Sequence, residues 1–200
     1  MNFLAHIYLS GPNELLTLGN FSADGIRGKT YNSYPNAMQA GILLHRFIDT
    51  YTDAHPIFRQ STKRLHSAYS HYSGVIVDIF YDHFLAKNWS NYSDQPLEEF
   101  IQEFYKSLKK NFELLPERFK HLTPFMIEDN WLLSYVTKEG IQKVLTGMNR
   151  RTKNRSQMHE ATKELKLYYL EFENDFTIFF DDLISTSNTK RLTLEKKYNL

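Results

Sequence analysis

The sequence predicts an all-α fold, a single-domain helical bundle, and three observations support that prediction. Apolar residues recur at spacings of three and four along most of the 200 residues, which is the period of an amphipathic helix. Aromatic residues make up 15% of the chain, including 13 Tyr and 15 Phe, and such rings fill the space between packed helices. A hydrophobic content of 42% and a charged content of 24% are typical of a globular chain that buries a sizeable core.

In the first ninety residues the periodicity predicts helices over 2–9, 13–27, 36–54, 57–70 and 75–89. Gly28 closes the second helix, and Pro56 ends the third because proline cannot extend a helix without losing a backbone donor. The last segment, VIVDIFYDHFLAKNW, is apolar almost all round, which for a helix indicates burial on most sides. Its β-branched start is also compatible with a strand, but no other run has the period of a partner strand.

The remaining helices are expected over 95–114, 117–123, 125–136, 138–147 and 157–185. The first of them opens at Pro96 and has one apolar stripe, which is typical of an amphipathic surface helix. Pro124 separates the second from the third, since proline breaks the helical hydrogen-bond ladder. No repeat or low-complexity linker divides the chain, so we expect one domain over 1–185 and a polar C-terminal tail over 186–200.

Charge and cysteine content exclude several classes of function. Twenty-four Lys and Arg against 23 Asp and Glu leave a formal charge of +1, which gives no basic field to attract nucleic acid or an anionic membrane. The absence of cysteine excludes disulfides, thiolate zinc sites and a cysteine nucleophile. The N-terminal MNFLAHIYLSG is too short an apolar stretch for a membrane span and lacks the basic start of a signal peptide. We therefore expect a cytoplasmic protein without a nucleic-acid or membrane partner.

Acidic and imidazole side chains fall at helical spacing in two of the predicted helices. His45, Asp49 and Asp53 stand at i, i+4 and i+8 and so form one row along a helix. Asp78 and Asp82 are again one turn apart in a largely apolar segment, where two carboxylates repel and lose hydration. A cation between them would relieve both costs, and imidazole and carboxylate ligands suit Mn²⁺, Mg²⁺ or Fe²⁺.

Each of these observations also has a purely structural explanation. A single buried histidine such as His45 is more often a hydrogen-bonded core residue than a ligand. Asp78 and Asp82 could be neutralised by Arg27 or Arg46 in a buried ion-pair network. The spacing alone therefore leaves a metal site and a metal-free network open.

Four segments resemble the acyl carrier protein phosphodiesterase family in their order and separation: MNFLAHIYLS, LGNFSADGIRG, GILLHRFIDTYTDAHP and VDIFYDHFLAKNW. The resemblance is strong over residues 1–90 and weaker beyond. It implies an all-α fold like that of the HD-domain metal-dependent phosphohydrolases, a role in fatty acid biosynthesis, and a divalent cation, Mn²⁺ in particular. It also implies the reaction, which is hydrolysis of the phosphodiester that joins 4′-phosphopantetheine to a serine of holo-acyl carrier protein.

The resemblance transfers a set of site residues motif by motif. It implies metal ligands at His6, Asp24, His45, Asp49, Asp78 and Asp82. Asp24 is also expected to be catalytic, with His55 or His83 as the general acid, because imidazole titrates near neutrality. Arg27 and Arg46 are expected to bind the phosphate. The sequence departs from the HD superfamily in one respect, since it has no His-Asp dipeptide and only the reversed pair Asp82-His83.

The expected protein partner is acidic, which requires a local basic surface on a chain of nearly zero net charge. The densest basic cluster is Arg150, Arg151, Lys153 and Arg155, of which Arg150 and Arg151 are expected to bind the substrate. The same strip is also compatible with an ordinary solvated loop. Two alternatives to the carrier-protein phosphodiesterase are an HD-like hydrolase of nucleotides or other small phosphoesters, and a metal-free helical binding module.

Overall fold

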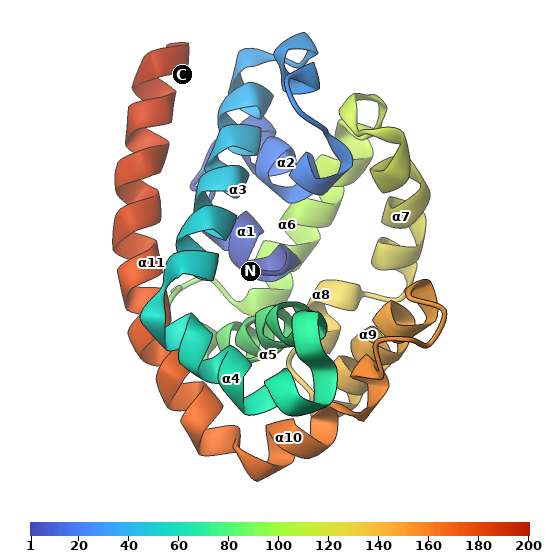
Figure 1. The fold of residues 1–200 in the computed structure, drawn as a ribbon. Coiled ribbons are helices and arrows are strands. Elements are labelled where there is room, and N and C mark those ends of the chain that lie inside the picture. Colours follow the sequence, from blue (N-terminus) through green and yellow to red (C-terminus); the bar gives the residue numbers. More distant parts are fainter.

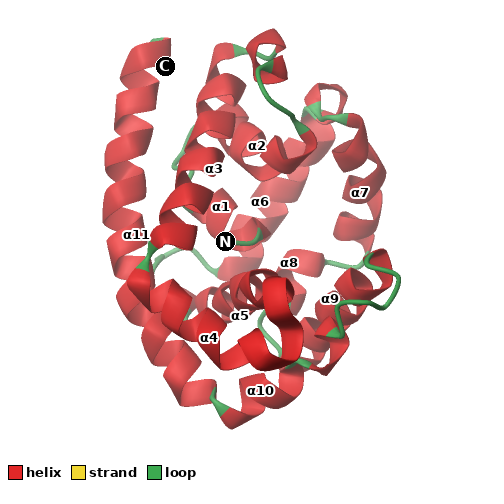
Figure 2. Cartoon of the chain, viewed as in Figure 1, coloured by secondary structure: helices red, strands yellow, loops and turns green.

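The computed structural model describes residues 1–200 as helices joined by short connections, without any strand (Figures 1 and 2). The α-helices are α1 Phe3–Tyr8, α2 Glu14–Ser22, α3 Asn36–Ala54, α4 Pro56–Tyr69, α5 Ser73–Lys87, α6 Leu97–Lys110, α7 Glu117–Glu128, α8 Trp131–Ser134, α9 Lys138–Arg151, α10 Thr162–Leu167 and α11 Tyr169–Tyr198. The predicted all-α fold is confirmed. None of these helices combines the length and apolarity needed to cross a membrane.

Most buried apolar residues form one core that includes much of α5, and a small second cluster consists of Ala23, Ile26 and Ile42. Ile76, Val77, Phe80 and Phe84 of this helix are fully buried, and α5 contacts α1, α4, α9 and α11. The segment that could have been a strand is therefore a helix, buried on most sides as its composition predicted.

Two glycines let α2 and α3 approach until their backbones touch. A Cβ atom on Gly19 would lie 2.2 Å from the carbonyl oxygen of Met38, and one on Gly41 would lie 2.0 Å from that of Leu16. Any larger residue would push the helices apart. Because His45 follows Gly41 by one turn, this close contact brings its side chain against the end of α2.

Asp82 fixes the start of α1. Its carboxylate accepts hydrogen bonds from the backbone N–H groups of Leu4, at 2.7 Å, and of Ala5, at 3.3 Å. These N–H groups belong to the first turn of α1 and have no partner within the helix. Asp82 therefore holds the six-residue helix that carries His6.

The C-terminal half differs from expectation at three places. Pro124 lies inside α7 instead of ending a helix, because the buried side chains of Phe119 and Met126 anchor α7 on both sides of it. The helix expected over 157–185 is interrupted between α10 and α11 at Tyr168.

The third difference is that α11 continues beyond residue 185 to Tyr198, alongside α3 in Figure 1. Ser187 is fully buried and Leu194 is 4% exposed, so this polar segment has an inner face that sequence composition did not reveal. The boundary between a 1–185 domain and a 186–200 tail stays a prediction.

Candidate metal centre

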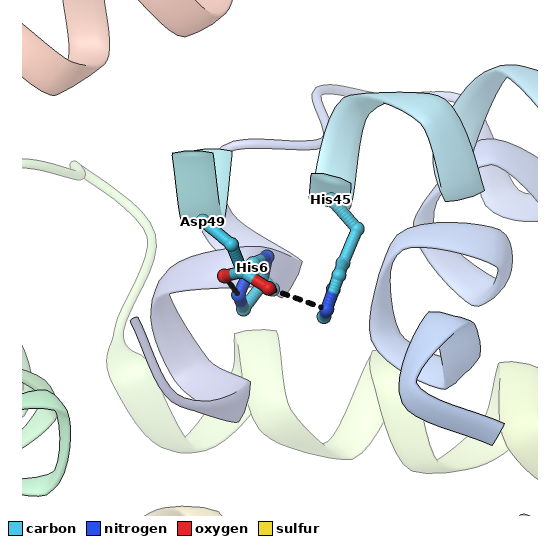
Figure 3. Close-up of side chains that lie close together, drawn as sticks. All are labelled: His6, His45 and Asp49. Carbon is cyan, nitrogen blue, oxygen red and sulfur yellow. Dashed lines mark ion pairs between the residues drawn. The ribbon is translucent and has the colours of Figure 1, made fainter. Parts of the chain in front are cut away.

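Three side chains from two helices lie close together (Figure 3). His6 comes from α1, whereas His45 and Asp49 come from consecutive turns of α3. The two oxygens of Asp49 lie 3.2 Å from Nε2 of His6 and 3.1 Å from Nε2 of His45. One ligand atom from each residue lies within 4.8 Å of the others, so the three could share one ion.

Asn20 of α2 orients both imidazole rings. Its side-chain Oδ1 lies 2.8 Å from Nδ1 of His6, and its main-chain oxygen lies 2.7 Å from Nδ1 of His45. The Asn20 amide nitrogen donates to the His6 carbonyl and to the Ser10 hydroxyl, which identifies Oδ1 as the acceptor. Both Nδ1 atoms therefore carry protons, and both Nε2 atoms face Asp49. Such fixing of the remote ring nitrogen is the usual support for a metal-binding histidine.

The pKa values follow from this crowding. Burial and the neighbouring His45 lower the pKa of His6 to about 4. Burial also opposes protonation of His45, but hydrogen bonds to Asp24 and Asp49 outweigh it and raise the pKa of His45 to about 9. Burial opposes the charge of Asp49, yet the two histidines hold its pKa well below the usual range.

The neutral His6 ring thus points its Nε2 lone pair at oxygen acceptors. Besides Asp49, the main-chain oxygen of Met1 lies 3.2 Å from this nitrogen. A lone pair facing two oxygens is repulsive unless a cation lies between them. The donor set of imidazole nitrogens and carboxylate oxygens therefore fits a divalent metal ion.

A cavity of about 240 Å³ opens onto this centre and is lined by Met1, Asn2, Phe3, His6, Asp24, His45, Asp49, Asp53 and Asp78. Four of these residues are aspartates. Asp24 Oδ1 lies 3.3 Å from His45 Nε2, and Asp78 pairs with the amine of Met1 at 2.9 Å. The resulting excess of carboxylates attracts cations.

Of the predicted metal ligands, the structure brings His6, Asp24, His45, Asp49 and Asp78 to this cavity. Asp82 does not line it, because its two oxygens hold the start of α1. Burial raises the pKa of Asp82 to about 7, against the two backbone hydrogen bonds.

The two predicted general acids also lie elsewhere. His55 is the N-cap of α4, where its Nδ1 accepts from the Ile57 N–H and its Nε2 lies 3.3 Å from Asp182 of α11. His83 is buried, with Nδ1 2.7 Å from the Tyr135 carbonyl and Nε2 2.9 Å from the Tyr169 hydroxyl. Neither side chain lines the cavity.

The four predicted substrate-binding arginines fall into two groups. Arg46 donates to the Ile26 carbonyl and lies over the ring of Tyr31, and Arg27 is exposed; neither lines the cavity. Arg150 and Arg151 line a second cavity that shares Asn2, Phe3 and Asp24 with the first. Arg150 and Arg151, at the end of α9, therefore line a cavity that adjoins the candidate metal centre.

Sequence reasoning missed Asn20. A signal was present, because Asn20 is a polar residue within the apolar segment LTLGNFS and lies inside one of the four family-like motifs. It is fully buried, and a buried amide must find hydrogen-bond partners. Which partners it finds depends on the contact between α2 and α3.

Comparison with known proteins gives a consistent result. A family model described as "Acyl carrier protein phosphodiesterase" matches residues 1–183. A protein of that name from Photorhabdus laumondii is 31% identical over 191 residues, which cover 95% of this chain and 96% of the relative. Relatives of the same name from Pectobacterium atrosepticum and Shigella boydii are 31% and 33% identical, and each match covers 96% of this chain and 100% of the relative. No solved structure matches, so the likeness to the HD domain stays a prediction.

Proposed function

The chain belongs to the acyl carrier protein phosphodiesterase family, and on that premise we propose that it hydrolyses holo-acyl carrier protein. The bond broken is the phosphodiester between 4′-phosphopantetheine and a serine, and the products are apo-acyl carrier protein and 4′-phosphopantetheine. The observation that most supports this chemistry is the pair of histidines whose Nδ1 atoms are both held by Asn20 while their Nε2 atoms face Asp49.

We propose that His6, His45 and Asp49 hold a divalent cation, with Asp24 as a further ligand, and that the cation is Mn²⁺, with Mg²⁺ or Fe²⁺ as substitutes. A cation of this kind supplies a water of lowered pKa and neutralises charge on the phosphoryl oxygens. Asp78 remains a predicted ligand, which would require it to leave the amine of Met1.

Asp24 has the position expected of a proton acceptor. Its side chain is 56% exposed and its Oδ1 lies 3.3 Å from His45, so it borders both the ligands and the solvent-filled cavity. The hydrogen bond from His45 keeps the pKa of Asp24 below its ordinary value, and the carboxylate is ionised at neutral pH. The ionised Asp24 carboxylate can therefore accept a hydrogen bond from an attacking water and orient it as the bond between phosphorus and the serine oxygen breaks; its lowered pKa favours this orienting role over full proton transfer.

His55 and His83 stay predicted general acids, but each would have to move to reach the reacting oxygen. His55 is tied to α4 and Asp182, and His83 to Tyr135 and Tyr169. Arg27 and Arg46 likewise stay predictions as phosphate-binding residues. Arg150 and Arg151 are better placed, on the wall of the adjoining cavity, where they can attract an acidic carrier protein.

The decisive experiment is mass spectrometry of holo-acyl carrier protein incubated with this protein and Mn²⁺. We expect a mass loss corresponding to the 4′-phosphopantetheinyl group, and no loss when a chelator is added or when Asp49→Asn replaces the wild type. An unchanged carrier protein together with hydrolysis of nucleotides would favour the small-phosphoester alternative. No hydrolysis of either substrate and no effect of Mn²⁺ on the melting temperature would favour the metal-free binding module.

A further inference from the structure

The second cavity is a groove of about 590 Å³, lined largely by α9, with residues of α8 and one residue of α7, Arg118. These three helices lie together on one side of the molecule in Figure 1. The volume of the groove lies within the range of roughly 300–1,000 Å³ that small-molecule sites show. Its apolar lining consists of Phe3, Trp131, Tyr135, Val144 and Met148. Its positive charge comes from Lys143, Arg150, Arg118 and Arg151.

Arg118 and Arg151 have no acidic partner. Neither forms an ion pair, and the one polar contact of the Arg151 guanidinium is with the sulfur of Met148 at 3.6 Å. Partial burial and the charge of Arg118 lower the pKa of Arg151. Carboxylates of Asp24, Asp129 and Glu139 also line the groove, yet none of them pairs with either arginine. Two guanidinium groups that line one groove without acidic partners are complementary to an anion with several oxygens.

Both arginines line the same groove as Asn2, Phe3 and Asp24, the residues that this groove shares with the cavity of the candidate metal centre. Tyr135 also lines the groove, and its hydroxyl accepts a hydrogen bond from Asn2 at 3.0 Å. The Arg118 guanidinium lies 5.9 Å from the centroid of the Phe119 ring.

The Phe119 ring in turn packs against the turn that carries Asp24. A Cβ atom on Gly25, the next residue, would lie 3.1 Å from that ring and 2.8 Å from Pro116. Asn2 and Asp24 border both cavities, so an anion bound by the two arginines would lie beside the predicted metal ligands.

We propose that this groove binds the 4′-phosphopantetheine arm of the substrate, with Arg118 and Arg151 on its phosphoryl oxygens. The aliphatic and amide portion of the arm then lies against Trp131, Val144 and Met148. This inference rests on the proposed function, and it assigns Arg151 to the small-molecule part of the substrate instead of the carrier protein surface. Continuity with the metal centre and charge complementarity support this occupant.

The test is calorimetric binding of 4′-phosphopantetheine, and of pantetheine without the phosphate, to the Mn²⁺-loaded protein. Arg118→Gln and Arg151→Gln should each weaken 4′-phosphopantetheine binding by roughly tenfold or more, as expected for loss of a hydrogen bond to a charged group, and leave pantetheine binding unchanged. Trp131→Ala should weaken both ligands. Arg155→Gln is the matched control, since Arg155 is an exposed arginine outside the groove, and it should bind both ligands as the wild type does.

Wild-type affinity for 4′-phosphopantetheine in both arginine variants would overturn the proposal. Equal losses for pantetheine and 4′-phosphopantetheine would also overturn it, because they indicate a structural defect. A loss confined to the binding of apo-acyl carrier protein would also overturn the proposal, because the arginines would then contact the carrier protein and not the 4′-phosphopantetheine arm. Release of 4′-phosphopantetheine from holo-acyl carrier protein by the wild type is measured in parallel. Failure of that release contradicts the proposed function, whereas normal release with unaffected variants contradicts the groove assignment alone.

Discussion

Substitution of Asn20 by alanine tests whether the two histidines are oriented for a metal. Asn20→Ala removes the side-chain oxygen that accepts from His6 Nδ1, but it keeps the main-chain oxygen that accepts from His45. One ligand therefore loses its support while the other keeps it. The ring of His6 becomes free to rotate or to adopt the other tautomer, and its Nε2 lone pair no longer points at Asp49 in a fixed way.

The size of the effect follows from the contacts that are lost. The Asn20 side chain bonds to His6 Nδ1 at 2.8 Å, to the His6 carbonyl at 2.9 Å and to the Ser10 hydroxyl at 2.9 Å. At about 1 kcal/mol net for each hydrogen bond, the free energy of unfolding should fall by roughly 3 kcal/mol. Loss of support for one ligating histidine typically weakens metal binding by roughly 10- to 100-fold.

The assay is Mn²⁺ titration by calorimetry, combined with denaturant unfolding of the metal-free protein. Asn13→Ala is the matched control, because Asn13 caps the same helix through Leu16 N; it should lose about 1 kcal/mol of stability and keep wild-type Mn²⁺ affinity. Asn20→Asp keeps an acceptor for His6 Nδ1 and should restore most of the affinity even though it destabilises the fold. Wild-type Mn²⁺ affinity in a folded Asn20→Ala protein would falsify the orienting role.

Three further predictions use other parts of the structure. Mn²⁺ should raise the melting temperature of the wild type by mass action. Asp49→Asn should abolish this rise, whereas Asp82→Asn should preserve it if Asp82 only holds α1. A rise that persists in Asp49→Asn but is lost in Asp82→Asn would identify Asp82 as a ligand. Arg150→Glu should raise the KM for holo-acyl carrier protein mainly through slower association, and the increase should become smaller as salt screens the charge. A KM increase that does not depend on salt would contradict electrostatic steering. Because the pKa of His45 is raised to about 9, Mn²⁺ must displace a proton from His45 to bind at neutral pH. Calorimetry should therefore show that the Mn²⁺ affinity rises by up to about tenfold per pH unit from pH 7 to 9 and is constant above pH 9. A Mn²⁺ affinity that does not depend on pH would exclude a protonated His45.

The local geometry of the site could be predicted from the sequence because helix period determines it. His45 and Asp49 are one turn apart, and their side chains meet in the folded chain at 3.1 Å. Asp78 and Asp82 have the same spacing but different surroundings: Asp78 faces the cavity and Asp82 faces the backbone of α1. The spacing in the sequence predicts that two side chains are neighbours on one helix. It does not state which other element packs over each of them.

The parts that could not be predicted depend on tertiary contacts. The role of Asn20 follows from the contact of α2 with α3, which requires glycine at Gly19 and Gly41. The helical path of 186–198 follows from the burial of Ser187 and Leu194, two positions in a segment whose composition is polar. In each case the structure depends on a few buried positions, which the overall composition of the segment does not reveal.

The arrangement of charge also explains how a chain with a net charge of +1 can act on an anionic substrate. Carboxylates are concentrated in the metal cavity and unpaired guanidinium groups in the adjoining groove, and the two regions meet at Asn2, Phe3 and Asp24. A cation is attracted to one side of this boundary and a phosphoryl group to the other. The reacting phosphorus should therefore lie at the boundary, next to Asp24, with the pantetheine arm extending along the groove.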